Sequence, residues 1–332
     1  MPEALTSAAA LGAQNLLAPA ILFFVLGLFG GFARSDLSLP ASTSRTLSLF
    51  LMLCIGFKGG VEAAEAGLSE GFVRAGVAGL ILSLAWPLVA YPVLRRIGGL
   101  ERATAAATAA AFGSVSVVTY AAGSDFLAAH GVVFGGYMTA VLAIMEAPAI
   151  LTALIIARRA AEGAAPGPAA GHSTGGILRE VFLGGPALML VGSFLIGLAT
   201  GERGMARLDT FVNPVFQGAL CLFLLDMGLA AARSLTDAGR PPLRVMALGI
   251  ALPLAGACAG YVASRLAGLA PGDSALLILL AASASYIAAP AAMRTALPEA
   301  KPGVYLGLSL GVAFPFNLIL GLPLYALAAG AL

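Results

Sequence analysis

The chain has 332 residues, of which 60% are hydrophobic and 10% are charged, and its formal net charge is +2. Soluble domains are about 45–50% apolar and about 25% charged, so this composition and a mean hydropathy of +0.97 exclude an ordinary soluble domain. They predict an integral membrane protein, and the small net charge argues against a nucleic-acid partner.

Ten apolar segments follow one another along the chain, each near the roughly 20 residues that a helix needs to cross a bilayer. Charged or glycine- and proline-rich stretches separate several of them, as at 34–36, 95–96, 201–203 and 239–242. We therefore expect an all-α membrane protein with ten transmembrane helices. The expected spans are 16–33, 45–64, 73–94, 103–122, 132–157, 180–199, 211–232, 243–267, 274–294 and 303–329.

The segment 160–178 is rich in Ala, Gly and Pro, which is typical of a flexible linker, and it separates two halves, 1–159 and 179–332. A shift of 169 residues lays Ser114 on Ser283 and Ser116 on Ser285. Because five spans is an odd number, we expect the second repeat to cross the membrane in the opposite sense. Inverted repeats are typical of secondary transporters with a site near the bilayer midplane; chance similarity between apolar segments is the alternative.

The distribution of arginine and lysine predicts the orientation. If the N-terminus lies outside, thirteen of these residues fall on the inner side and five on the outer side. We therefore expect both termini outside and the linker at 160–178 in the cytoplasm.

Two clusters of small, hydroxyl-bearing residues interrupt the fourth and ninth apolar segments. Each holds a serine pair at positions i and i+2, Ser114 with Ser116 and Ser283 with Ser285. A buried hydroxyl needs a partner that lipid does not offer, and residues two apart do not share a helix face. The pattern predicts a broken helix that receives a solute at membrane depth; serines bonded back to their own helix are the alternative.

A helix that restarts in mid-membrane presents uncapped N–H groups and the positive end of its dipole, which favours an anion. Serine hydroxyls and freed carbonyls suit a sodium ion beside it. The predicted substrate-binding residues are Phe112, Gly113, Ser114, Val115, Ser116, Ala284, Ser285, Tyr286 and Ile287. The predicted ion-coupling residues are Ser116, Thr119, Glu146, Ser283 and Ser285.

Glu146 lies within a span, two residues before Pro148, which frees a backbone carbonyl. Intramembrane ionisable residues are costly and often functional, so we expect an ion ligand or a proton carrier; a carboxyl satisfied by a neighbouring helix end is the alternative. Lys58 and Asp226 occupy equivalent positions of the two halves, and we interpret both as ion-pairing or snorkelling residues. Lys58 shares its helix face with Glu62, which is typical of a solvated stripe.

We find no phosphate-binding loop, zinc-ligand spacing or nucleophile–base arrangement in the chain. We therefore expect neither an enzyme nor an ATP-driven pump, and no cofactor or metal apart from a co-transported sodium ion. Energy for transport would then come from an ion gradient.

Along nearly its whole length the chain resembles the sodium-dependent bicarbonate transporters of the cyanobacterial SbtA type. The segments that carry the resemblance are Ile-Gly-Phe-Lys-Gly-Gly at 55–60, Phe-Gly-Ser-Val-Ser at 112–116 with Thr119, Met-Glu-Ala-Pro-Ala at 145–149, Met227-Gly228, and 281–298 with Arg294 and Pro298 in register. The resemblance implies two inverted five-helix repeats, with a core domain that moves against a gate domain. It also implies a homotrimer in the lipid of the bacterial inner membrane, with periplasmic termini, that carries sodium and bicarbonate inward.

The chain departs from that family pattern at several positions. Tyr286 stands where the family has an Asp, Val117 and Ala289 replace glycines, and Glu146 replaces an Asp. The missing carboxylate argues against an identical cation site, and Tyr286 either narrows the pocket or presents its hydroxyl to the anion. The family's long cytoplasmic linker, associated with a PII-like regulatory partner, is short here, which argues against that regulation.

Our hypothesis from the sequence is therefore a secondary active transporter that couples bicarbonate to sodium. The first alternative is the same scaffold carrying another small anion or a carboxylate, with protons coupled through Glu146. A second alternative is a receptor-like or structural membrane protein that transports nothing.

Overall fold

The computed structural model describes residues 17–67, 69–161, 185–237 and 242–332. Within these ranges the regular secondary structure is helical, with no strand, which confirms the predicted all-α class. Seven helical stretches in the same ranges are long and apolar enough to cross a membrane. The linker predicted at 160–178 lies outside the described residues, except for 160 and 161 at the end of a helix.

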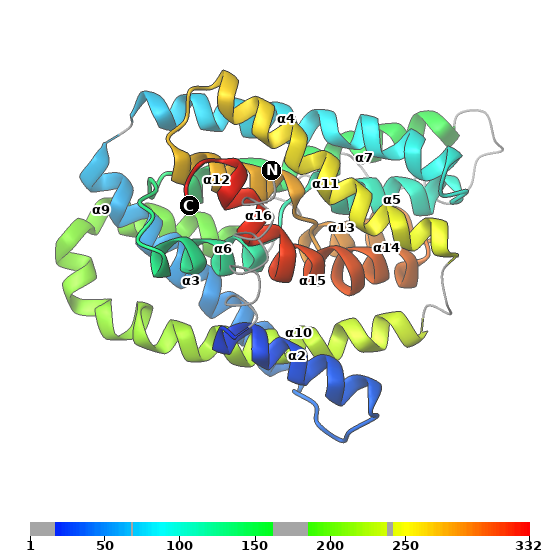
Figure 1. The fold of residues 1–332 in the computed structure, drawn as a ribbon, viewed down its shortest axis with the longest axis horizontal. Coiled ribbons are helices and arrows are strands. Elements are labelled where there is room, and N and C mark those ends of the chain that lie inside the picture. The colour runs from blue at the N-terminus through cyan, green and yellow to red at the C-terminus, as the bar shows by residue number, and fades with distance from the viewer. Residues whose placement is uncertain (1–16, 68, 162–184, 238–241) are drawn as a thin grey trace.

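The helices follow one another with few long connections (Figure 1). In chain order they are α2 (Pro19–Phe32), α3 (Ala41–Ala66), α4 (Glu70–Arg96), α5 (Arg102–Gly113), α6 (Val117–Ala129), α7 (Met138–Ala161), α9 (Gly185–Val212), α10 (Pro214–Asp237), α11 (Leu243–Leu266), α12 (Pro271–Ala282), α13 (Ala288–Ala296), α14 (Pro302–Leu308), the π-helical η2 (Ser309–Ala313), α15 (Phe314–Phe316), the π-helical η3 (Asn317–Gly321) and α16 (Leu322–Ala328).

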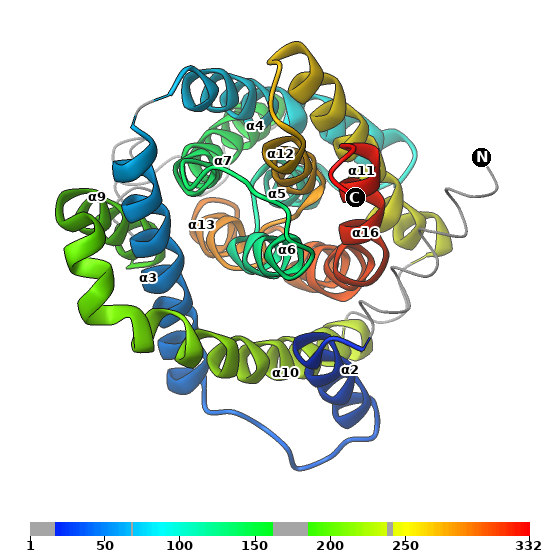
Figure 2. The ribbon, with the colours of Figure 1, turned by 60° about the vertical axis from the view of Figure 1, so that its left-hand side comes forward.

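The break predicted at 201–203 is confirmed as a kink at which two helices meet. The span labelled α9 runs to Val212, but Gly201 within it takes a non-helical conformation with φ 52° and ψ −148°, so one helix ends there and a second one follows. Glycine tolerates this positive φ without steric cost, while the residues after it are mostly good helix formers. The bend produces a short second arm, residues 202–212, that turns away from the first part of α9 (Figure 2).

The two interrupted pairs, α5 with α6 and α12 with α13, lie in the interior, and α2, α3, α9 and α10 form an arc around one side of them (Figure 2). Every residue of α5 from Thr104 to Gly113 is buried, and so is nearly all of α12. A helix that is apolar on all sides and fully buried belongs to the centre of a large helical protein. The centre of the molecule is therefore where the chain changes from helix to extended backbone.

Helix α4 has the opposite pattern, with one apolar face exposed. Val73, Val77, Ile81 and Leu88 are all more than half exposed and recur at helical spacing. In a chain with this hydropathy such a stripe faces lipid, because no water-exposed surface favours it. Helices α4 and α11 thus cover the edge of the molecule opposite α2 and α10 (Figure 1).

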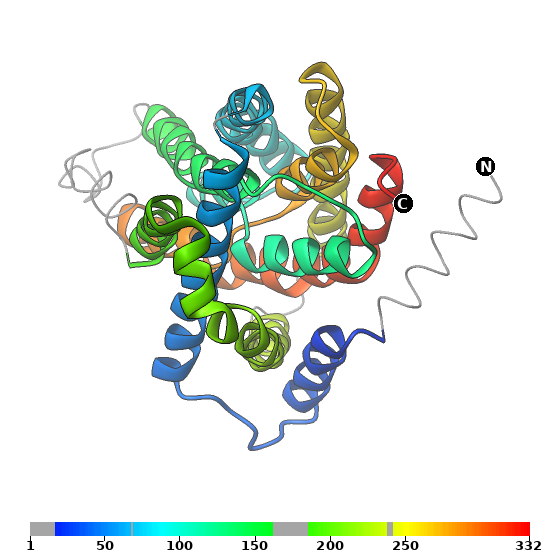
Figure 3. The same cartoon turned by 90° about the vertical axis from the view of Figure 1, so that its left-hand side faces the viewer.

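Helix α2 packs against α10 through direct backbone contact (Figure 3). A Cβ atom at Gly228 would lie 2.2 Å from the carbonyl oxygen of Phe24, and one at Gly27 would lie 2.0 Å from that of Leu225. Only glycine permits this approach, which gains van der Waals contact where lipid supplies no hydrophobic driving force.

Helix α3 packs against α9 in the same way. A Cβ atom at Gly60 would lie 2.0 Å from the carbonyl oxygen of Phe194, and one at Gly197 would lie 2.2 Å from that of Phe57. The arc is therefore held together by two glycine seams, one between α2 and α10 and one between α3 and α9.

Replacing Gly228 with alanine is expected to lower the melting temperature of the detergent-solubilised protein by several degrees. The new methyl group meets backbone, which cannot rotate away, and overpacking of this kind costs about 1–3 kcal/mol. Gly218, on the same helix, is the matched control because nothing lies within 4 Å of its Cβ position. Equal melting temperatures for Gly228→Ala and Gly218→Ala would contradict the seam.

Candidate functional site

The first interruption lies between α5 and α6, at residues 114–116. Ser116 has extended backbone and caps α6, because its hydroxyl accepts the backbone N–H of Thr119 at 3.1 Å. Helices leave their first N–H groups without intrahelical partners, and this cap satisfies one of them. In the described structure the N–H groups of Val117 and Val118 have no such partner.

The second interruption lies between α12 and α13, at residues 283–287, and repeats this chemistry. The hydroxyl of Ser285 accepts the backbone N–H of Ala289 at 3.2 Å. The hydroxyl of Ser283 donates to the Leu280 carbonyl at 2.8 Å, which satisfies one of the last carbonyls of α12. Each predicted serine cluster therefore ends one helix and starts the next.

The two interruptions cross and bond to each other. The backbone N–H of Ser116 donates to the hydroxyl of Ser283 at 3.1 Å, and the backbone N–H of Ser285 donates to the carbonyl of Ala111 at 2.7 Å. All four residues are buried. Polar backbone buried at this depth is tolerated only where protein satisfies it or where it lines a cavity, so this crossing is the candidate site.

Two side-chain hydrogen bonds join other helices to the crossing. Ser114 donates from its hydroxyl to the carbonyl of Glu146 at 2.9 Å. Asn317 donates from its amide to the carbonyl of Ala282, the last residue of α12, at 2.8 Å, and its own amide oxygen accepts the hydroxyl of Tyr325 at 2.8 Å. Helix α7 and the π-helical part of the last helix are thereby tied to the crossing.

Helix α7 is opened next to Glu146 by a serine from α4. Pro148 has no N–H, and Ser83 donates to the carbonyl of Met145 at 2.6 Å while accepting the N–H of Ala149 at 3.2 Å. A side chain inserted between residues i and i+4 is an ordinary cause of a helix kink. Glu146 is 8% exposed at this point, and within the described residues no hydrogen bond or ion pair reaches its carboxyl group.

Replacing Ser83 with alanine is expected to destabilise the protein by about 1–3 kcal/mol, because two buried backbone groups of α7 lose a partner. Ser264 is the matched control: it is equally buried, and its hydroxyl bonds back to Tyr261 of its own helix. Chemical or thermal unfolding should show a clear loss for Ser83→Ala and a smaller one for Ser264→Ala. Similar losses would mean that Ser83 does not support the kink.

A cleft of about 470 Å³ lies between the arc and the interior helices. Lys58 and Glu62 line it from α3, Asp125 from α6, and Gln217 from α10. The predicted stripe of Lys58 and Glu62 thus faces a cleft between two helix groups. Tyr120, the residue after Thr119, also lines this cleft.

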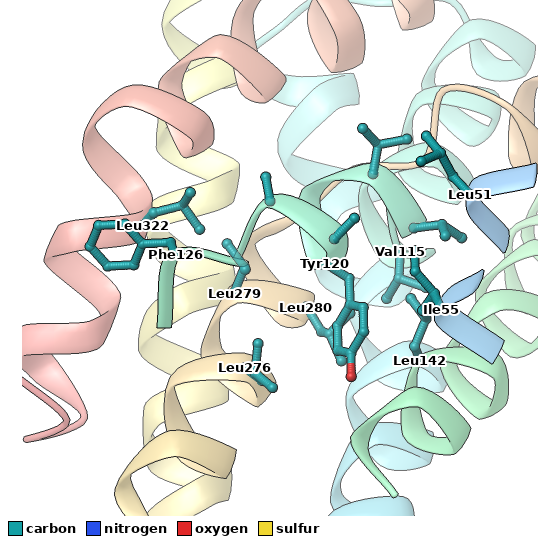
Figure 4. Close-up of a cluster of buried hydrophobic side chains, with 14 of the residues drawn as sticks. Leu51, Ile55, Val115, Tyr120, Phe126, Leu142, Leu276, Leu279, Leu280 and Leu322 are labelled. Atoms are coloured by element: carbon teal, nitrogen blue, oxygen red, sulfur yellow. The ribbon is translucent and has the colours of Figure 1, made fainter. Parts of the chain in front are cut away.

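Between the cleft and the crossing the packing is apolar. Val115 lies with Leu51 and Ile55 of α3 and Leu142 of α7, and Leu280 of α12 closes the same cluster (Figure 4). The hydroxyls of Tyr120 and Thr139 lie 3.1 Å apart at the end of the cleft. The small cavity beside the crossing, lined by Phe112, Gly113 and Ala281 together with residues of α4 and α7, measures about 10 Å³, which is roughly one water molecule. A bound anion would therefore require these side chains to move apart.

The residues that were predicted from the sequence to interrupt the two helices are the ones that do so in the structure. All predicted residues from 112 to 116 and from 283 to 287 lie at or beside the crossing, and Glu146 joins them through its carbonyl. Ligand binding by these residues stays a prediction. Reasoning from sequence missed Ser83 and Asn317; a polar side chain inside an apolar span was the available signal for both.

These features define a class: an all-helical, multi-pass membrane protein in which two broken helices meet in the interior, as in secondary transporters. Residues 19–330 match the model of the Na+-dependent bicarbonate transporter superfamily, so the chain belongs to that superfamily and is a transporter. The match confirms the resemblance derived from the sequence. A search among curated proteins finds no significant match.

Proposed function

We propose that the protein is a sodium-coupled bicarbonate symporter that binds its anion where α6 and α13 begin. The observation that carries the proposal is the buried crossing, where Ser116 and Ser285 cap two helix N-termini and bond across to the opposite interruption. Two helix N-termini favour an anion without any arginine. The family description supplies the cargo, sodium and bicarbonate.

We further propose ten spans arranged as two inverted repeats, 1–159 and 179–332, joined by a cytoplasmic linker at 160–178. The glycine seams support this arrangement. Gly60 of α3 and Gly228 of α10 lie 168 residues apart in sequence, and Gly27 of α2 and Gly197 of α9 lie 170 apart. If each helix is replaced by its equivalent in the other half, the seam between α2 and α10 becomes the seam between α9 and α3. A pseudo-two-fold axis that relates the two halves requires this correspondence.

The arc formed by α2, α3, α9 and α10 would be the gate domain, and the helices that carry the crossing would belong to the core domain. The cleft between them supports this division, because it separates α3 and α10 from α6. With the N-terminus outside, the charged end of α3 and the last turn of α6 would both lie near the outer surface, so the cleft would open outward. On this proposal the protein works as a homotrimer in the bacterial inner membrane.

Uptake of labelled bicarbonate into proteoliposomes tests the proposal. An inward sodium gradient should drive accumulation, whereas replacement of sodium by potassium or choline should abolish it. Uptake that follows a proton gradient and ignores sodium would favour the alternative, another small anion or a carboxylate coupled to protons through Glu146. No flux of any small anion under either gradient would overturn the transport proposal.

A further inference from the structure

The phenol oxygen of Tyr286 differs from the other buried side-chain oxygens and nitrogens of the described residues. It has no hydrogen-bond partner, although the residue is only 7% exposed. Buried polar groups are almost always paired, and each exception needs an explanation. An unpaired hydroxyl buried in a ligand-binding protein is available to donate a hydrogen bond to a ligand.

The ring of Tyr286 is held in place while its hydroxyl stays free. It packs edge-on against Phe314, with ring centroids 5.2 Å apart, and Phe314 packs in the same way against Phe24 of α2 at 5.3 Å. Phe314 begins the short α15 between two π-helical segments, a form of helix that often marks functional sites. The phenol therefore has a fixed direction.

The hydroxyl of Tyr286 points toward the crossing. Tyr286 lies within the second interruption, directly after Ser285, and its hydroxyl lies toward the Ser116 side chain without a well-formed hydrogen bond. In the described structure the N–H groups of Val117 and Ala288, at the starts of α6 and α13, are also uncapped. Three donors that lack partners among the described residues thus lie at or next to the two interruptions, and unpaired donors of this kind favour an anion.

We propose that Tyr286 is a specificity-determining residue that donates its phenol hydrogen to an oxygen of the bound anion. This inference rests on the proposed transport function and narrows its ligand to small oxyanions. A hydroxyl donor bonds best along an oxygen lone pair, and a site built around such a donor discriminates against ligands that leave it unpaired. Bicarbonate, formate and nitrate fit this requirement better than chloride.

The test is a titration of the detergent-solubilised full-length protein with sodium bicarbonate, followed by thermal unfolding, for wild type and Tyr286→Phe. The variant should melt at the wild-type temperature or above it without ligand, because an unpaired hydroxyl is removed. Its affinity for bicarbonate should fall at least tenfold, and its preference for formate over chloride should shrink.

Tyr137→Phe is the matched control, because the Tyr137 hydroxyl, just before α7, donates to Asp273 in the first turn of α12, at the opposite end of that helix from the crossing. This control should melt lower than wild type but keep its affinity. Bicarbonate affinity of Tyr286→Phe within twofold of wild type, or a drop in its melting temperature like that of the control, would overturn the inference and leave transport standing. A wild-type protein that responds to no oxyanion would overturn both.

Discussion

Replacing Ser116 or Ser285 with alanine is expected to reduce sodium-driven bicarbonate uptake at least tenfold while the protein still reaches the membrane. Each hydroxyl caps the helix that begins at an interruption, Ser116 for α6 and Ser285 for α13. Loss of a cap costs about 0.5–2 kcal/mol, which the buried fold can tolerate. Without the cap the first turn of the helix frays. This turn carries the N–H donors that must be aligned to bind the anion.

Ser309→Ala is the control for this pair of variants. Ser309 is fully buried in the last helix, and its hydroxyl bonds back to the carbonyl of Tyr305 one turn earlier. The Ser309→Ala variant loses the same hydroxyl group but leaves every helix N-terminus unchanged, so uptake should stay near wild type. Full uptake by both Ser116→Ala and Ser285→Ala, measured per molecule in proteoliposomes, would place the site elsewhere.

The parts of the fold that follow from local chemistry could be predicted from the sequence. Apolar length predicts where helices run, and a serine pair two residues apart predicts where they break, as at Ser114 and Ser116. The cap made by Ser116 is also local, since donor and acceptor lie three residues apart. In each case the residues that cause a structural feature lie within a few positions of that feature in the sequence.

Contacts between distant segments could not be predicted in this way. The bond from Ser116 to Ser283 joins residues 167 apart, and Ser83 reaches a helix 62 residues later. Glycine is so abundant in this chain that its spacing alone does not say which glycines meet backbone. The structure distinguishes Gly228, which packs against the backbone of α2, from Gly218, whose Cβ position has no neighbouring segment within 4 Å.

The region after the kink at Gly201 shows a different limit. The stretch Gly201-Glu202-Arg203 carries the signals of a loop, a glycine followed by charges, and we predicted a break there. Gly201 does break the helix there, but the charged residues after it form a second helical arm, 202–212, where we expected a connection between spans. The charges end the apolar pattern of the span, but they do not prevent a further helix outside it.

Replacing Glu146 with glutamine is expected to abolish sodium-driven uptake, by at least a hundredfold, without loss of folded protein. A carboxylate is costly at membrane depth, by about 2.5–3.5 kcal/mol on insertion scales for an aspartate, and within the described structure no cationic side chain pairs with this one. A transported cation beside it would offset that cost and would couple its own binding to that of the anion. Glutamine keeps the size and the backbone bond from Ser114 but removes the charge, so sodium affinity should collapse.

Glu70→Gln is the control, because Glu70 pairs with Arg74 at the exposed start of α4, and uptake should remain near wild type. The pH dependence of Glu146→Gln separates the two coupling schemes. If Glu146 carries protons, the variant mimics the protonated form, and uptake loses its response to a pH gradient while any sodium response persists. If Glu146 binds sodium, the sodium response disappears first. If the Glu146→Gln variant keeps both the sodium dependence and the pH dependence of the wild type, Glu146 has neither role. If the variant fails to fold, the carboxyl group of Glu146 has a structural role instead.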